Sequence, residues 1–270
     1  MKVMQLLLIL VISVYLGICL YYYFFQERHI FFPSRELQDW SHEFNYEEIS
    51  ITTEDGETLH SWFLDNNAEL TVLYLHGNGG NISGLTPQFK VFEQLNVNAL
   101  VFDYRGYGKS TGKITQEQDV YSDAHAAYEF LLSEKKVSPQ ALVVWGHSLG
   151  GAAAVELTRS KLARAVILES TFTSLDELAR GDYSYLPSSI ILRYHFGNIE
   201  KIDQIHLPIL IIHGDGDDVI PVLHAERLYE KANEPKTLAI ISDVNNHEPL
   251  VYFPRYIPPL ESFLNIIRGE

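Results

Sequence analysis

The sequence predicts an α/β protein in which helices cover both faces of a mostly parallel sheet of eight strands. Most of the predicted strands are continuous apolar runs, which are typical of strands buried on both faces. Helical patterns separate these runs along the chain, which is the order expected for a parallel sheet. The length of 270 residues and the hydrophobic content of 46% are sufficient for one large core. We therefore expect one α/β domain rather than two.

The overall charge excludes one class of partner. The chain has a formal net charge of -15 and no cluster of lysine and arginine, whereas proteins that bind nucleic acid present a basic face to the phosphates. We therefore predict no nucleic-acid partner. The single cysteine, Cys19, lies in an apolar run, so the sequence predicts neither a disulfide framework nor a metal site built on thiols.

The first element is an apolar segment over residues 3–25, which carries no charge. About twenty apolar residues cross a bilayer as a helix, and Tyr21, Tyr22 and Tyr23 suit the aromatic belt at the interface. A cleaved signal peptide is the alternative, but the run is longer than usual and no small-x-small cleavage site follows. We expect a membrane anchor over residues 1–30 and a catalytic domain over residues 31–270, on the non-cytoplasmic side of the membrane.

The strands of the sheet follow the anchor. Residues 46–53 alternate in polarity, residues 54–57 form a hairpin turn, and residues 58–64 return, so two antiparallel strands open the sheet. The continuous apolar runs then predict six further strands, at residues 71–75, 99–102, 141–145, 165–168, 209–212 and 238–241.

Helical patterns and one irregular section lie between the predicted strands. Helices are expected at residues 88–95, 116–132, 149–160, 222–231 and 256–267. Residues 171–206 follow neither pattern and contain Pro187 with many aromatic and aliphatic residues. We interpret this section as a short lid.

The segment V-W-G-H-S-L-G-G at residues 144–151 predicts a nucleophile. Ser148 lies in a GxSxG pentapeptide, after an apolar strand and before an alanine-rich helix. Gly146 and Gly150 allow a tight turn, which exposes the serine hydroxyl at the carboxyl end of the sheet. A serine hydroxyl is a weak nucleophile, so it also requires a base, an orienting acid and an oxyanion hole.

The loop after the predicted strand at residues 209–212 offers the acid. Asp217 is the preferred candidate, Asp218 is the near alternative, and Asp215 is a weaker one. Glu169, at the end of the preceding predicted strand, is a fallback. Aspartate and glycine are also ordinary turn residues, but the ligand spacing of a calcium loop is missing.

His247, just after the last predicted strand, is the candidate base. Ser148, Asp217 and His247 then follow one another in the order serine, acid, histidine. His213 is the competitor because it ends a strand beside the acid loop. We expect His76 and His147, both in motif loops, to be buried and hydrogen-bonded.

Two backbone amides are predicted to form the oxyanion hole. The glycine-rich loop at residues 75–81 resembles an HGGG-type loop, and we assign the first donor to Asn78, with Gly79 as the alternative. The second donor is Leu149. Each such donor contributes about 3 kcal/mol to transition-state stabilisation. We expect Asp103 and Arg105 to hold the next loop, residues 103–110, in support of the oxyanion segment.

These motifs together resemble the α/β-hydrolases, more narrowly the membrane-anchored Bem46-like serine hydrolases and the related ABHD proteins. The shared residues lie in motif order over residues 30–265 and comprise F-P-S-R at 32–35, H-G-N-G-G-N at 76–81, D-Y-R-G-Y-G at 103–108, G-H-S-L-G-G at 146–151, His213 to Pro221 through Asp217, and His247. The resemblance implies an α/β-hydrolase fold and hydrolysis by a serine, with acyl esters, thioesters or lipids as substrates. Asn245 and Asn246 depart from the family, which usually has glycines before the histidine.

We therefore expect a serine esterase or thioesterase that needs no cofactor and no metal. The anchor and the apolar lid section favour a small-molecule or lipid-like substrate with an apolar acyl group, contacted by Tyr183, Leu186 and Ile190. A serine peptidase on the same scaffold is one alternative, which cleavage of amides without cleavage of esters would favour. A non-catalytic, hydrolase-like membrane receptor is another, which failure to react with a fluorophosphonate would favour.

Overall fold

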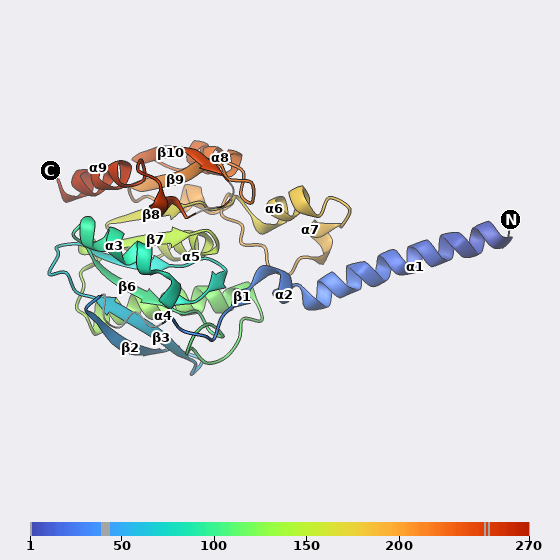
Figure 1. The fold of residues 1–270 in the computed structure, drawn as a ribbon, viewed down its shortest axis with the longest axis horizontal. Helices are drawn as coiled ribbons and strands as arrows, with labels where there is room; N and C mark the ends of the chain where they lie inside the picture. The colour runs from blue at the N-terminus through green and yellow to red at the C-terminus, as the bar shows by residue number, and fades with distance from the viewer. Residues whose placement is uncertain (1, 39–43, 246, 248, 270) are drawn as a thin grey trace.

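An eight-stranded sheet forms the centre of the computed structural model, which describes residues 2–38, 44–245, 247 and 249–269 (Figure 1). The strand order is β10-β9-β8-β7-β4-β6-β3-β2. The strands are β2 (Tyr46–Thr52), β3 (Thr58–Leu64), β4 (Thr71–Leu75), β6 (Asn98–Phe102), β7 (Leu142–His147), β8 (Ala165–Glu169), β9 (Ile209–Gly216) and β10 (Lys236–Asn245). Strand β3 runs antiparallel to β2 and β6, and the other five neighbouring pairs are parallel, so the mostly parallel sheet is confirmed.

The burial of the strands follows their place in the sheet. All residues of β4, β6 and β8 are buried, as continuous apolar runs predict for central parallel strands. The edge strand β2 alternates between exposed and buried residues instead. It pairs with β3 from Tyr46 opposite Leu64 to Thr52 opposite Thr58, across the predicted hairpin turn.

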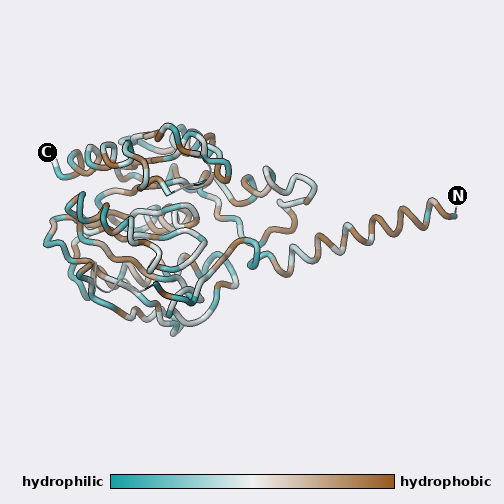
Figure 2. The backbone as a smooth tube through the Cα atoms, in the orientation of Figure 1, coloured by the Kyte–Doolittle hydropathy of each residue, from teal (hydrophilic) through white to brown (hydrophobic). Residues whose placement is uncertain are grey.

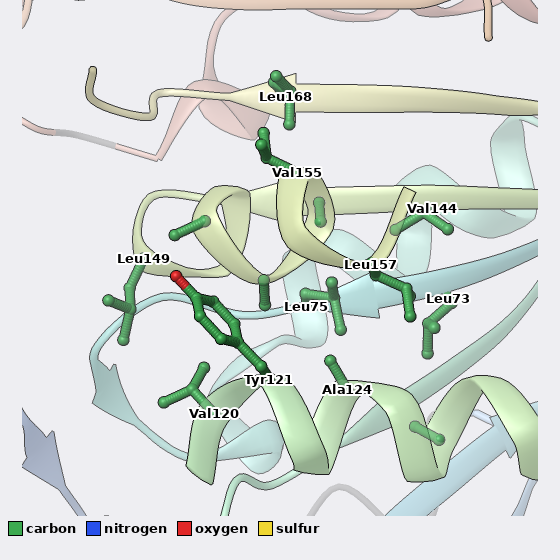
Figure 3. Close-up of a cluster of buried hydrophobic side chains, with 14 of the residues drawn as sticks. Leu73, Leu75, Val120, Tyr121, Ala124, Val144, Leu149, Val155, Leu157 and Leu168 are labelled. Atoms are coloured by element: carbon green, nitrogen blue, oxygen red, sulfur yellow. The ribbon is translucent and has the colours of Figure 1, made fainter. Parts of the chain in front are cut away.

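Helices cover both faces of the sheet. Buried residues of α3 and α9 belong to one apolar cluster, and those of α4, α5 and α8 to another, on the opposite face. Figure 3 shows part of the second cluster, where Ala124 of α4 points toward Leu75 and Val155 of α5 points toward Leu168. The helices of the domain are α3 (Thr86–Gln94), α4 (Glu117–Ser133), α5 (Leu149–Thr158), α8 (Leu223–Lys231) and α9 (Ile257–Arg268), with single 3₁₀ turns at Ile82–Gly84, Pro139–Ala141, Ile202–Gln204 and Leu250–Tyr252.

Helix α3 begins two residues before the predicted start at residue 88. Pro87 lies in its first turn, where the missing N–H group costs no hydrogen bond because the first amides of a helix have no intrahelical acceptor. A proline therefore marks the start of this helix.

A second, two-stranded sheet was not predicted. Strand β1 (Phe32–Pro33) pairs in parallel with β5 (Gly79–Gly80) of the glycine-rich loop. The Phe32 amide donates to the carbonyl oxygen of Asn78 at 2.9 Å, and the Ser34 amide donates to that of Gly80. The segment that follows the apolar helix is therefore attached directly to the predicted oxyanion loop.

Helix α1 (Lys2–Phe25) extends away from the domain and is apolar along most of its length (Figure 2). Its 24 residues are long and apolar enough to cross a membrane, as predicted for residues 3–25. The short helix α2 (Glu27–Ile30) connects it to β1.

The section at residues 171–206 contains two short helices, α6 (Leu175–Asp182) and α7 (Ser188–Ile191). They project from the carboxyl edge of the sheet toward α1, and α7 packs against it (Figure 1). Tyr194 and Phe196, which follow α7, are fully buried in the core beside Phe31.

Candidate active site

Ser148 stands at the sharp turn between β7 and α5. Its backbone has φ 51° and ψ -117°, a strained conformation for a residue with a side chain. The glycines beside it are required by space: a Cβ on Gly150 would lie 1.9 Å from the Leu75 carbonyl oxygen, and one on Gly146 would lie 2.4 Å from that of Gly150. The strand, turn and helix predicted around Ser148 are all present.

His247 and Asp217 are joined by a hydrogen bond. The distance from His247 Nδ1 to Asp217 Oδ2 is 2.7 Å. The other carboxylate oxygen of Asp217 accepts the amides of Val219 and Ile220, at 3.0 and 2.8 Å. Burial alone would raise the pKa of Asp217, but the hydrogen bonds from His247 and Ile220 outweigh it and lower the pKa. Asp217 is thus an anion that accepts a hydrogen bond from His247 Nδ1, and no hydrogen bond to His247 Nε2 is present among the described residues.

Ser148 and His247 line the same cavity. The ring of His147 stacks on that of His247, with 6.0 Å between the centroids. Burial, and then the neighbouring charge of His247, lowers the pKa of His147 to about 3, so His147 is neutral. Within the described part of the chain, no hydrogen bond joins Ser148 to His247. Catalytic hydrogen bonds are often long in free enzymes and shorten in the substrate complex.

Asn78 and Leu149 also line this cavity. Leu149 is the first residue of α5, so its amide has no acceptor within the helix, and the Asn78 amide has no backbone acceptor among the described residues. The Asn78 side chain donates to the Ile30 carbonyl oxygen at 2.8 Å, and Tyr107 Oη donates to the Asn78 carbonyl oxygen at 2.8 Å. Gly79, the alternative donor, pairs with Phe32 and is not part of the cavity wall.

The cavity has a volume of about 270 Å³ and a mostly apolar wall. Tyr183 and Leu186 of the lid section line it. Ile190, the third residue expected to contact the acyl group, is not on the wall: it is 79% exposed, and its neighbour Ile191 lies on the wall instead. Adjacent residues of a helix point about 100° apart, so Ile190 and Ile191 of α7 face different surroundings.

Curated relatives are similar to this chain in sequence over most of its length. YfhR of Escherichia coli is 33% identical over 255 residues, which cover 90% of this chain and 86% of YfhR. Bem46 of Schizosaccharomyces pombe is 37% identical over 201 residues, which cover 70% of this chain and 67% of Bem46.

The chain belongs to the Bem46-type α/β-hydrolases.

Two further comparisons agree with this membership. Residues 66–189 match the family described as serine aminopeptidase, S33. Among solved structures, an esterase from Pyrococcus furiosus superposes with a TM-score of 0.73 and 26% identity, over 87% of this chain and 98% of the esterase. The α/β-hydrolase fold that the motifs predicted is therefore confirmed.

The alternative acids of this Bem46-type hydrolase have other environments. Asp218 is exposed, and Asp215 accepts the amides of Asp243 and Val244. Glu169 is buried, and its Oε2 accepts hydrogen bonds from Trp145 Nε1 and Tyr256 Oη, each at 2.8 Å. None of the three carboxylates has a described hydrogen bond to His247.

The competing base, His213, belongs to the support of the acid loop in this hydrolase. Its Nε2 donates to the Ile220 carbonyl oxygen at 2.7 Å and lies 3.6 Å from Asp217 Oδ2. The ring is fully buried, and burial lowers its pKa. His213 therefore helps to fix the loop that carries Asp217.

The loop at residues 103–110 connects the oxyanion segment to the core. Asp103 Oδ1 accepts the Ile82 amide at 2.8 Å, and Asp103 Oδ2 faces His60 Nδ1 at 3.2 Å. Arg105 forms ion pairs with Asp55 and Asp123. These contacts agree with the supporting role expected for Asp103 and Arg105, and His76 is buried with a hydrogen bond to Gly77, as expected.

Sequence reasoning missed one group of cavity residues in the Bem46-type site, and one residue that supports the site from outside the cavity wall. Tyr22, Gln26 and His29, at the end of α1 and in the turn into α2, belong to the cavity wall. The residue outside the wall is Tyr107, whose hydroxyl donates to the Asn78 carbonyl oxygen and which was not singled out within its loop. The sequence gives no signal for Gln26, because the burial of its side chain is visible only in the tertiary structure.

The sequence predicted no metal site, and a metal site in a protein needs a group of His, Cys, Asp or Glu side chains. Over the described ranges, no three such residues are placed so that they could hold a metal ion.

Asn245 and Asn246 are the two residues that depart from the family pattern before His247. Asn245 is the last residue of β10, and Asn246 lies outside the described residues.

Proposed function

We propose that this hydrolase cleaves carboxylic esters or thioesters with an apolar acyl group, through an acyl-enzyme on Ser148. The observation that carries the proposal is the 2.7 Å hydrogen bond between His247 and Asp217 beside the cavity that Ser148 lines. The strained turn at Ser148 supports it further, because strained backbone of this kind concentrates at reactive sites.

In the proposed reaction, His247 Nε2 accepts the proton of Ser148 as Oγ attacks the acyl carbonyl carbon. The negative charge that develops on the carbonyl oxygen is received by the amides of Asn78 and Leu149. His247 then donates its proton to the leaving oxygen or sulfur, which departs as an alcohol or thiol. Water, deprotonated by His247, then attacks the acyl carbon, and His247 returns that proton to Ser148 Oγ as the acid leaves.

The apolar acyl group is proposed from the wall of the cavity. The lid side of the wall contains leucine, isoleucine and aromatic side chains, and Phe172 and Val219 are further apolar residues of the wall. Ligand sites of this composition bind apolar groups, with a few polar groups to orient them. Tyr183 and Leu186 are the predicted residues that we retain for this role.

We also propose that residues 1–30 are a retained membrane anchor and that residues 31–270 form the catalytic domain on the non-cytoplasmic side. Gln26 supports retention of the helix, because its side chain is buried and hydrogen-bonded to the lid section at Ile191 and Arg193. Removal of a signal peptide would remove part of the cavity wall, including Tyr22.

A serine peptidase is the second candidate, favoured by the match of residues 66–189 to the serine aminopeptidase family. The same groups would attack an amide carbonyl, and His247 would protonate the departing amine. Paired ester and amide substrates with the same acyl group separate the two activities: cleavage of the amide without the ester would replace the esterase proposal.

Fluorophosphonate labelling tests the nucleophile. We expect wild type to be labelled and Ser148→Ala not to be labelled, with Ser160→Ala, a serine at the end of α5 away from the cavity, labelled like wild type. Labelling of Ser148→Ala would refute the nucleophile, and no labelling of wild type would favour a receptor without turnover. A series of p-nitrophenyl esters tests the acyl group, and a sharp preference for acetate would refute the apolar acyl chain.

A further inference from the structure

The end of the apolar helix is part of the candidate active site. Tyr22 of α1, with Gln26 and His29 after it, lines the same cavity as Ser148 and His247. An anchor that serves only as a tether has no reason to contribute side chains to a substrate cavity. The inference below rests on the proposed function and concerns the source of its substrate.

One hydrogen bond and a ring contact join α1 to the lid section, and Gln26, the residue after α1, adds two more hydrogen bonds. Tyr15 Oη donates to the Tyr185 carbonyl oxygen at 3.0 Å. Gln26 Nε2 donates to the Ile191 carbonyl oxygen at 3.2 Å, and Gln26 Oε1 accepts the Arg193 amide at 2.8 Å. The rings of Tyr22 and Tyr183 are 5.6 Å apart. The lid helices α6 and α7 therefore lie beside α1 rather than over the domain alone (Figure 1).

The contact at Tyr15 fixes the level of the lid relative to a membrane. A helix of 24 residues is about 36 Å long, and the hydrocarbon core of a bilayer is about 30 Å thick. If both ends of α1 reach an interface, at most about 6 Å of it emerges from the core on the domain side. Tyr15 lies about 15 Å along the helix from Phe25. The lid tip at Tyr185, bonded to Tyr15, therefore reaches the membrane surface or lies below it.

The side chains of the lid suit this level. Tyr185 is 57% exposed and Ile190 is 79% exposed, although both are apolar or aromatic. Tyrosine is enriched where protein meets the bilayer interface, and an exposed isoleucine is favourable in contact with acyl chains. Arg180, which is exposed on α6, forms an i,i+4 ion pair with Asp176, as suits a helix at the level of the polar headgroups.

We propose that α6 and α7 lie in the interfacial layer of the bilayer against α1, and that the Ser148 cavity takes the acyl chain of a membrane lipid ester directly from that bilayer. The acyl chain then passes from the lipid layer into a cavity walled by Tyr22, Tyr183 and Leu186 without crossing water. The ester carbonyl, which lies near the interface in a lipid, reaches Ser148 at the same level.

The depth of the lid is tested with a tryptophan at its tip. The full chain is placed in phosphatidylcholine vesicles whose acyl chains are brominated, and tryptophan fluorescence is compared with the same vesicles without bromine. We expect the signal added by Tyr185→Trp to be quenched. Leu162→Trp is the matched control, because Leu162 is also exposed but lies at the opposite edge of the sheet, and its added signal should not be quenched. Equal responses of the two variants would overturn the proposal.

The source of the substrate is tested with two esters that have the same leaving group. 4-Methylumbelliferyl oleate is incorporated in the bilayer, and 4-methylumbelliferyl acetate is supplied in water. Tyr22→Trp enlarges a residue of the cavity wall, and we expect it to lower the ratio of oleate to acetate hydrolysis about tenfold. Tyr21→Trp is the control: the adjacent residue is absent from the wall, and both rates should match wild type. An unchanged ratio in Tyr22→Trp would contradict the proposal.

The two proposals fail in different ways. If wild type hydrolyses neither ester and does not react with a fluorophosphonate, the proposed function is wrong, whatever the depth of the lid. If wild type hydrolyses the oleate ester in detergent micelles but not in the bilayer, the proposed function stands and direct loading from the membrane is refuted.

Discussion

The hydroxyl of Tyr107 donates a 2.8 Å hydrogen bond to the carbonyl oxygen of Asn78. The same carbonyl oxygen also accepts a hydrogen bond from the Phe32 amide of β1. Two donors thus hold the glycine-rich loop in one place, and the candidate oxyanion amide of Asn78 belongs to the same residue. An oxyanion donor is effective only when its position is fixed before the reaction begins.

Replacement of Tyr107 by phenylalanine tests this support. Loss of one neutral hydrogen bond should lower the free energy of unfolding by about 1 kcal/mol, and a looser Asn78 amide should lower kcat more than it changes KM. Tyr104→Phe is the control, because Tyr104 is also fully buried in this loop but its hydroxyl has no hydrogen-bond partner in the described structure. Equal effects of both variants on kcat would show that Tyr107 acts only through packing.

The acid is tested by comparing two neighbouring aspartates. Asp217→Asn removes the charge that orients and stabilises the His247 ring, and we expect turnover to fall by about 10⁴-fold, as in other serine hydrolases that lose this acid. Asp218→Asn, at an exposed site, should retain turnover within a factor of two to three of wild type. The rate of labelling by a fluorophosphonate provides a second measurement. A large loss in Asp218→Asn alone would move the acid to residue 218.

The strained backbone at Ser148 predicts that a glycine at this position makes the protein more stable than an alanine does, although both variants are inactive. A residue with a Cβ at φ 51° is strained, whereas glycine adopts positive φ without that cost. Ser148→Gly and Ser148→Ala both lose the nucleophile, but only glycine relieves the strain. We expect Ser148→Gly to be more stable than Ser148→Ala by about 1 kcal/mol, which corresponds to about 2–4 °C in Tm. A higher Tm for the alanine variant would contradict the interpretation of this backbone as strained.

The sheet and its covering helices could be predicted because their signals are local. Continuous apolar runs identify central strands such as β4, and the GxSxG segment carries the geometry of its turn within eight residues. The pairing of β1 with β5 could not be predicted, because a strand of two residues has no periodicity and its partner residues lie 47 positions later in the sequence. The contacts of α1 with the lid share this property, since they join residues such as Tyr15 and Tyr185 that only the tertiary fold brings together.

The choice among carboxylates shows a further limit of the sequence. Both Glu169 and Asp217 lie at carboxyl ends of strands, so chain order allows either to orient a histidine. What separates them is the neighbouring side chains: Asp217 faces His247, whereas Trp145 and Tyr256 enclose the Glu169 carboxyl group. The sequence does not show that these two residues surround Glu169, because Trp145 lies on an adjacent strand and Tyr256 lies 87 residues later in the chain.

The enclosed Glu169 carboxyl group predicts a pH dependence of stability. Burial raises its pKa to about 7, against the hydrogen bonds from Tyr256 and Trp145, from an ordinary value of 4.5. The folded state therefore holds a proton that the unfolded state releases, so this contribution is complete below about pH 4.5 and is lost as the pH rises through about 7. Glu169→Gln keeps an acceptor oxygen for both donors but cannot ionise. We expect the free energy of unfolding of wild type to fall relative to that of Glu169→Gln between about pH 5 and pH 8, by an amount on the order of 2–3 kcal/mol at most. Glu261→Gln, at an exposed site on α9, should follow wild type across this range, and a constant difference between wild type and Glu169→Gln would show that Glu169 does not titrate there.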